Sequence, residues 1–220
     1  MMNTYKNWAV LGTDLLSTEN DITSLCENIP NTALCGVSVL PLYLKTAHEA
    51  LGNKQLPLIA IVGYPYGHSA IEAKLAEMVL ALVDGATVIQ FVINHIAIRN
   101  NDWKYVANEL NHLQLIASNK QVKLQAFIIL SILTNEALQR CCDLYGIAGL
   151  DALVISTDDL SELDALASIK FIRLHLTNNV KLGVSGHIKT INFAEDIIKS
   201  EVDFIQTSNY EKLLQQYQNA

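Results

Sequence analysis

Short apolar runs rich in β-branched residues recur along the chain and alternate with longer segments of a different periodicity. Unbroken apolar runs are typical of parallel strands that are covered on both faces. We therefore interpret the runs as parallel strands. There are eight of them, at residues 8–12, 33–40, 57–63, 87–93, 122–130, 152–156, 180–185 and 203–207.

The segments between these runs have the spacing of amphipathic helices. In 68–83 and 103–118, apolar residues recur at intervals of three and four, which places them along one helix face. Ser17 or Thr18, and later Thr134, stand where a helix N-cap is expected. Strands that alternate with helices predict either an open doubly wound sheet or a closed barrel. Eight evenly spaced repeats favour the barrel, an α/β fold of the (β/α)8 TIM-barrel class.

Length and composition agree with this prediction. The chain has 220 residues and no proline-rich linker, charge block or low-complexity segment, so we expect one TIM-barrel domain over 1–220. The mean hydropathy of +0.24 fits a parallel sheet that is covered on both faces.

Charge and targeting signals narrow the possible partners. A net charge of −7 argues against a nucleic-acid partner, because phosphate backbones are bound by basic surfaces. No apolar window has the length of a membrane span or of a signal peptide, so we expect a cytoplasmic protein that contacts no membrane.

Neither a metal nor a cofactor is expected from the motifs. The four cysteines have no metal-ligand spacing, and we expect them to be reduced and mostly buried. No paired histidine spacing supports a metal site either. The candidates for such a site would be His68, His95, His187 and Asp158.

In a barrel of this class, the functional residues lie at the carboxyl ends of the strands. Asp14 and Asp158 could form an acid/base pair across the barrel mouth. Alternatively, Asp158 and Asp159 are N-caps of the next helix, the interpretation that we favour. The polar residues that define the candidate pocket are Thr13, Asp14, Ser38, Tyr64, Gln90, Asn94, His95, Ser131, and those of 156–158, 185–187 and 207–209.

Seven segments resemble, in order, motifs of the deoxyribose-phosphate aldolase family. They are VSVLP at 37–41, GYPYG at 63–67 with Lys74 behind it, FVIN at 91–94 followed by DW at 102–103, LTNEA at 133–137, GLD at 149–151, GHIKT at 186–190 and TS at 207–208. The corresponding family motifs include V-C-V-x-P, F-P-x-G, L-T-x-E, G-A-D, G-G-I-R-T and G-T-S-S. The resemblance extends over nearly the whole chain and implies the fold of a class I aldolase barrel.

The positions that carry catalysis in that family hold other residues here. The family's Schiff-base lysine belongs to a K-T-S-T-G motif, in which this chain has Val154 at the lysine and Asp158 at the glycine. A second family lysine aligns with Gly183, and the acid/base aspartate aligns with Gln90. Valine cannot form an imine, and an amide has no useful proton to exchange near neutral pH. Three further departures are Gln125, Ile129 and Leu11.

A relocated lysine is the alternative to lost chemistry. Lys181 and Gly183 are two residues apart in a strand, so their side chains point to the same face. An alignment shifted by two residues would therefore offer Lys181 as the Schiff-base lysine. At roughly 3.3 Å per residue, it would lie about 6–7 Å below the usual level. Lys123 also begins a strand, on the face opposite the expected active site.

The resemblance also implies a ligand site. The family holds a substrate phosphate with backbone amides after strands seven and eight, so a small sugar phosphate or anion is the expected partner. The same residues could instead only cap the last helices. The ligand-binding candidates are Gly186, His187, Thr207, Ser208, Asn209, Ser156, Asn94 and Tyr64.

Three functional hypotheses follow. The first is a catalytically degenerate family member that keeps a mouth pocket for a small phosphorylated or sugar-like ligand, or acts through protein contacts. The second is an active aldolase that uses a relocated lysine such as Lys181. The third is a different enzyme on the same scaffold, using Asp14, His95, Asp158 or His187. A homodimer is a further possibility. Tyr217 lies near the C-terminus, where active members usually have a tyrosine that reaches the pocket.

Overall fold

The structure is a computed structural model that describes residues 8–12, 17–29 and 34–218. Its strands are all parallel and form a closed barrel in the order of the sequence. Each lies within one residue of its predicted limits, which confirms the predicted fold class. They are β1 (Trp8–Leu11), β2 (Leu34–Val39), β3 (Leu58–Val62), β4 (Val88–Val92), β5 (Lys123–Ile129), β6 (Ala152–Ser156), β7 (Lys181–Ser185) and β8 (Phe204–Thr207).

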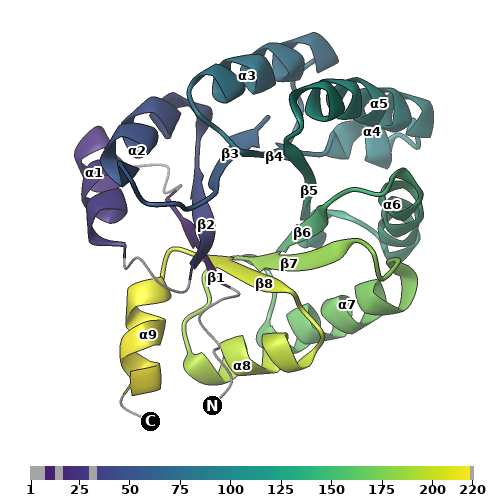
Figure 1. Ribbon diagram of the computed structural model, residues 1–220. Coiled ribbons are helices and arrows are strands. Elements are labelled where there is room, and N and C mark those ends of the chain that lie inside the picture. The colour runs from purple at the N-terminus through teal and green to yellow at the C-terminus, as the bar shows by residue number, and fades with distance from the viewer. Residues whose placement is uncertain (1–7, 13–16, 30–33, 219–220) are drawn as a thin grey trace.

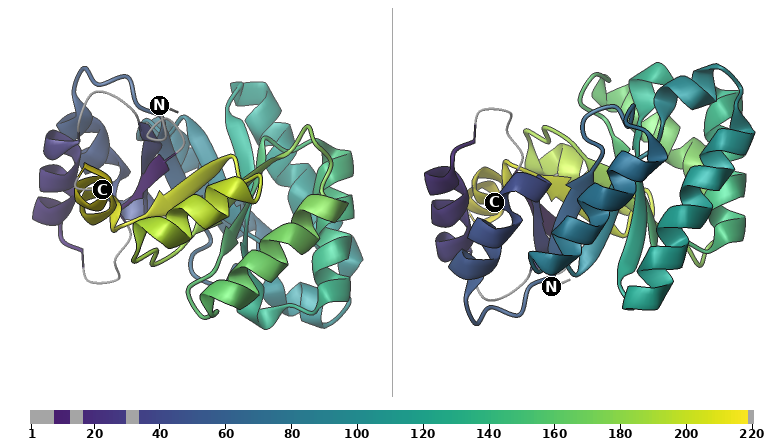
Figure 2. Two further views of the ribbon diagram at one scale, coloured as in Figure 1. Left: turned by 90° about the horizontal axis from the view of Figure 1, so that it is seen from below. Right: turned by 90° about the horizontal axis from the view of Figure 1, so that it is seen from above.

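Helices surround this inner ring of strands (Figure 1). Seen from the side, they cover the outer surface of the barrel (Figure 2). The α-helices are α1 (Glu19–Asn28), α2 (Leu44–Leu51), α3 (Ile71–Val83), α4 (His95–Arg99), α5 (Trp103–Lys120), α6 (Asn135–Ala148), α7 (Glu162–His175), α8 (Ile191–Lys199) and α9 (Tyr210–Gln218), and the 3-10 turns are η2 (Pro41–Tyr43) and η3 (Leu130–Ile132). Among the described residues, no helix has both the length and the apolar character required to cross a membrane.

Two of the helix starts follow the sequence prediction. Thr18 caps α1 in a reciprocal arrangement with Asp21, and the Thr134 side chain accepts a hydrogen bond from the Ala137 amide at the start of α6. The predicted cap of α7 is wrong. Ser161, not Asp158 or Asp159, caps this helix, because the chain runs three residues further before it turns into α7.

A layer of neutral amides crosses the middle of the barrel. The side-chain Nε2 of Gln90 donates to Oε1 of Gln125 at 3.0 Å and to Oε1 of Gln206 at 3.1 Å. Gln206 Nε2 in turn donates to Ser38 Oγ at 3.0 Å and to Gln90 Oε1 at 3.2 Å. Bonded polar groups avoid the cost of unpaired burial, so this layer links β2, β4, β5 and β8 without charge.

An apolar cluster fills much of the remaining interior. Its buried members come from β3, β4, β5, β6 and β8. They are Ile61, Val92, Phe127, Ala152, Val154 and Phe204. The interior of this barrel is therefore a packed core of apolar side chains and mutually bonded amides, and the lysines described below lie outside it.

One buried ion pair stands outside the barrel, between α3, α5 and β4. Lys74 Nζ lies 2.6 Å from Glu109 Oε1, and both side chains are fully buried. The same Nζ donates to the carbonyl of Val92 at 2.8 Å. Burial lowers the pKa of Lys74 and raises that of Glu109. Lys74 therefore holds two helices against the barrel and faces away from its interior.

Candidate functional site at the barrel mouth

The carboxyl ends of the strands surround a cavity of about 150 Å³. Its walls combine aromatic and aliphatic side chains with hydroxyl and carboxylate groups. They are formed by Ile61, Tyr64, Pro65, Tyr66, Phe127, Ile129, Ser156, Asp158, Asp159 and Ser185. Of the residues that the sequence suggested for the pocket, Tyr64, Ser156, Asp158 and Ser185 thus line this cavity.

Val154 is the residue that the motif resemblance aligns with the family's Schiff-base lysine. It is fully buried and belongs to the apolar cluster with Ile61 and Phe127. Its side chain thus contributes packing, and no primary amine lies at this level of β6.

An aromatic ring from the next strand fills the space beside Gly183, the residue that the motif resemblance aligns with the second family lysine. Gly183 on β7 pairs with Phe204 on β8. A Cβ at Gly183 would lie only 2.4 Å from the Phe204 Cζ atom. Phe204 was not predicted as a site residue, because its role depends on the pairing of two strands and has no local signal in the sequence.

Asp158 engages a backbone amide of the β7–α8 loop, part of the ligand site that the motif resemblance implies. Its Oδ1 accepts a hydrogen bond from the backbone N–H of His187 at 2.7 Å, and its Oδ2 accepts one from Ser156 Oγ at 3.2 Å. Gly186 allows this approach, because a Cβ there would lie 2.9 Å from Asp158 Oδ1. An internal carboxylate therefore sits beside the β7–α8 loop, at the position where the family motif has glycine.

Other loop amides are also used within the protein. The Gly186 amide donates to the Gln206 carbonyl at 3.1 Å. The Asn209 amide donates to Thr207 Oγ1 at 3.2 Å, and its side-chain amide donates to the Ile188 carbonyl at 3.4 Å. Thr207 is fully buried, whereas Ser208 is exposed. These contacts favour a structural role for much of the predicted phosphate loop.

Asn94 and His95 lie beside the mouth and have structural contacts. Asn94 caps α4 by accepting a hydrogen bond from the Ala97 amide at 3.0 Å. The two ring nitrogens of His95 lie 3.1 Å from the Tyr66 carbonyl and 3.1 Å from the Ile129 amide nitrogen. Burial lowers the pKa of His95 to about 4. With both nitrogens engaged, His95 lacks a free lone pair for acid/base work.

Lys181 lies at the opposite end of the barrel. It is the first residue of β7 and lines a cavity at the amino ends of the strands, together with Lys123. The amide layer and the apolar cluster separate this end from the mouth.

Two predicted positions, Thr13 and Asp14, lie outside the described residues, as do the side chains of Leu11 and Tyr217.

The burial of the cysteines agrees with the prediction that most of them are buried. All four are free, and Cys26, Cys141 and Cys142 are buried, while Cys35 is partly exposed. Within the part of the chain that the structure describes, no group of three or more histidine, cysteine, aspartate or glutamate side chains could hold a metal ion.

The fold and the mouth define a (β/α)8 barrel with a small polar pocket above a packed interior, and known proteins place this barrel in a family. A deoxyribose-phosphate aldolase from Clostridium botulinum is 30% identical over 199 residues, which cover 90% of this chain and 89% of the relative. A second deoxyribose-phosphate aldolase, from Clostridioides difficile, is 27% identical over 198 residues, which cover 90% of this chain and 89% of that relative. The chain therefore belongs to the deoxyribose-phosphate aldolase family.

Solved structures share the fold. A deoxyribose phosphate aldolase from Aeropyrum pernix, described as having a unique tetrameric structure, superposes with a TM-score of 0.86 at 19% identity, covering 98% of this chain and 91% of that one. The structure designated QR15, an aldolase, superposes with a TM-score of 0.83 at 22% identity. The superposition covers 100% of this chain and 99% of that one. No family model matches the sequence.

Proposed function

We propose that this chain is a degenerate member of the family, which binds a small sugar-like molecule at the barrel mouth without forming an imine. The observation that carries the proposal is Val154, a fully buried apolar side chain at the position of the Schiff-base lysine. Imine chemistry requires a desolvated lysine of lowered pKa within reach of the substrate carbonyl. The Phe204 ring beside Gly183 supports the same proposal, because it fills the space of the second lysine.

The alternative of an active aldolase depends on Lys181. This residue is exposed and lies at the amino ends of the strands. A substrate held at the mouth would have to pass the bonded amides of Gln90 and Gln206 to meet it. The geometry therefore favours binding without covalent chemistry.

The groups at the mouth also indicate the chemistry of the ligand. Asp158 places a carboxylate beside the β7–α8 loop and already accepts the His187 amide. Two anionic groups at close range repel each other strongly when partly shielded from water, which disfavours a phosphate in this position. The hydroxyls of Ser156 and Ser185 and the wall formed by Tyr64 suit an uncharged polyol, such as an unphosphorylated sugar.

Borohydride trapping tests the absence of imine chemistry. The protein is incubated with deoxyribose 5-phosphate or acetaldehyde, reduced, and weighed intact, with the Clostridium botulinum relative as the positive control. We expect an adduct on the relative and none on this chain. A stoichiometric adduct on this chain would overturn the proposal, and its loss in Lys181→Gln would establish the relocated lysine.

Substitution of Asp158 tests the ligand class. Asp158→Gly frees the His187 amide and removes the charge, whereas Asp158→Asn removes only the charge. Asp159→Gly is the matched control, because it removes a neighbouring wall carboxylate that bonds Ser131 instead of the loop. In thermal-shift titrations, we expect the unmodified chain to respond to deoxyribose more than to its 5-phosphate. Phosphate binding should appear in Asp158→Gly, more weakly in Asp158→Asn, and not in the control; equal responses in all chains would contradict the assignment.

A further inference from the structure

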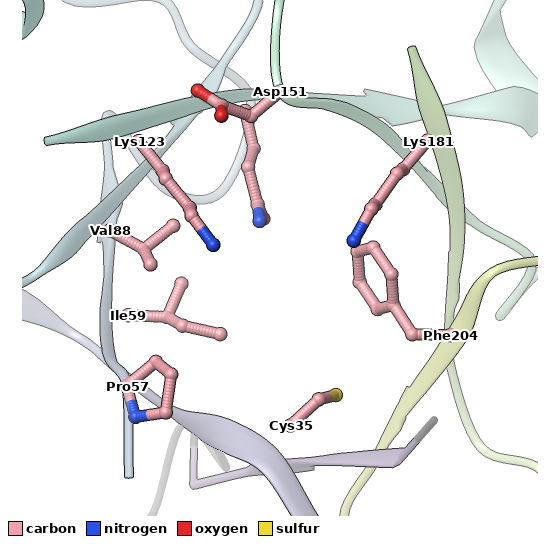
Figure 3. A pocket seen from close by; sticks show the side chains of 9 residues that line it. Cys35, Pro57, Ile59, Val88, Lys123, Asp151, Lys181 and Phe204 are labelled. Atoms are coloured by element: carbon pink, nitrogen blue, oxygen red, sulfur yellow. The ribbon is translucent and has the colours of Figure 1, made fainter. Parts of the chain in front are cut away.

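The amino ends of the strands enclose a second cavity, of about 170 Å³, on the far side of the barrel from the mouth (Figure 3). We call it the basal cavity. Its lower walls are apolar and come from four different strands, through Cys35, Ile59, Val88 and Phe204. Ile59 and Val88 are almost completely buried and pack against Cys35. The cavity thus offers an apolar surface for part of a ligand.

Two lysines stand over this apolar surface. Lys123 begins β5 and Lys181 begins β7, and the parity of these strands directs both side chains inward. Figure 3 shows both ammonium groups pointing toward the middle of the cavity. Neither makes an ion pair or a hydrogen bond with any residue that the structure describes. Both lysines are exposed, so water screens their mutual repulsion, and an anion placed between them would be attracted by both charges.

The remaining polar groups leave the lysines available. Asp151 also lines the cavity, but its Oδ2 accepts the Leu124 amide at 2.8 Å, and Figure 3 shows its carboxylate turned away from the two ammonium groups. Gln125 lines the cavity from above, with its Oε1 occupied by Gln90 at 3.0 Å. Its Nε2 donates to no described residue, so the cavity has a third donor beside the two cations.

We propose that the basal cavity binds a small organic anion, a carboxylate or phosphate ester that carries an apolar group. The anionic end contacts Lys123, Lys181 and the Gln125 amide, and the apolar end lies against the wall of Ile59, Val88 and Phe204. Hydrogen bonds between charged partners are stronger than neutral ones, and a partly enclosed apolar wall adds burial energy. The site is separate from the mouth and requires no catalysis at either end.

Titration with simple probes tests the proposal. Phenyl phosphate and benzoate are the anionic probes, and benzyl alcohol is the neutral probe of similar shape. Binding is followed by amide NMR shifts in the unmodified protein and by calorimetry in the variants. We expect shifts at Cys35, Ile59, Lys123 and Lys181, none at the mouth, and weaker binding as salt rises.

The variants separate charge from fold. Lys181→Gln and Lys123→Gln should each weaken phenyl phosphate roughly tenfold or more, in line with the loss of one charge-assisted hydrogen bond, and the double variant should abolish binding. Lys181→Arg should retain it. Lys189→Gln is the matched control, since Lys189 lies in the β7–α8 loop at the other end of the barrel.

Three results would overturn the proposal. They are the absence of shifts in the unmodified protein, equal affinity for benzyl alcohol, and unchanged anion affinity in the double lysine variant. The NMR titration needs no substitution, so it decides the question even if a variant folds poorly.

Discussion

Acidification should destabilise this barrel through His95, which is 1% exposed. The Ile129 amide can only donate, so Nε2 of His95 accepts and Nδ1–H donates to the Tyr66 carbonyl. Protonation of Nε2 would break the hydrogen bond from the Ile129 amide and would leave a buried positive charge on the imidazole ring. Burial, assisted by the positive charges of Lys74 and His68, lowers the pKa to about 4 from the ordinary value of 6.5.

The sign and size of the effect follow from this shift. Between these two pKa values, the unfolded chain binds a proton at His95 that the folded chain does not, so stability is complete above the unfolded pKa and falls as the pH decreases. For one such group, moving from about pH 7.5 to about pH 5 lowers the free energy of unfolding by about 2 kcal/mol.

Urea unfolding at both pH values measures this loss. The comparison is between the unmodified chain and His95→Gln, whose amide cannot titrate, so that contributions of all other groups cancel in the difference. His112→Gln, on the exposed face of α5, is the matched control. The unmodified chain and the control should lose about 2 kcal/mol more than His95→Gln over this pH range. Equal losses in the three chains would refute the assignment of a buried neutral imidazole.

Three further predictions concern stability and are measured by urea or thermal unfolding. Gly183→Ala should cost about 1–3 kcal/mol, because its Cβ would meet the Phe204 ring, and Phe204→Leu in the same chain should recover part of this; no cost would contradict the packing. Lys74→Met should cost about 3–5 kcal/mol by leaving Glu109 buried and unpaired, and adding Glu109→Leu should restore much of it; additive losses would contradict this. Thr134→Ala should cost about 1 kcal/mol through loss of the α6 cap; an unchanged transition would show that the cap contributes nothing.

The barrel could be predicted from the sequence because its signals are local. A parallel strand covered on both faces needs a continuous apolar run, and each run ends where polar residues begin the next loop. A helix cap such as Thr134 is also a local signal, because its side chain bonds an amide only three residues further along the chain. The inward direction of Lys181 follows from strand parity alone.

The details of the site could be predicted less well, because they depend on contacts between distant segments. Asp158 is of a residue type that commonly caps helices, yet its carboxylate accepts a hydrogen bond from the His187 amide in another loop. Phe204 fills the space above Gly183 only because β7 and β8 pair in one particular register. Similarly, strand parity does not reveal that Lys123 and Lys181 share one cavity.

The amide layer has a consequence for how the two ends of the barrel communicate. Energetic coupling between distant sites requires an intervening element with two arrangements that each ligand can bias. Gln90 and Gln206 exchange hydrogen bonds in both directions, and Gln125 Oε1 and Ser38 Oγ accept from their remaining N–H groups, so the donors of these two amides are fully engaged, whereas Gln125 Nε2 donates to no described residue. A ligand in the basal cavity that uses the free Gln125 amide leaves the hydrogen bonds between Gln90 and Gln206 in place, so we expect occupancy of one end to leave the affinity of the other unchanged, and by linkage this independence must hold in both directions.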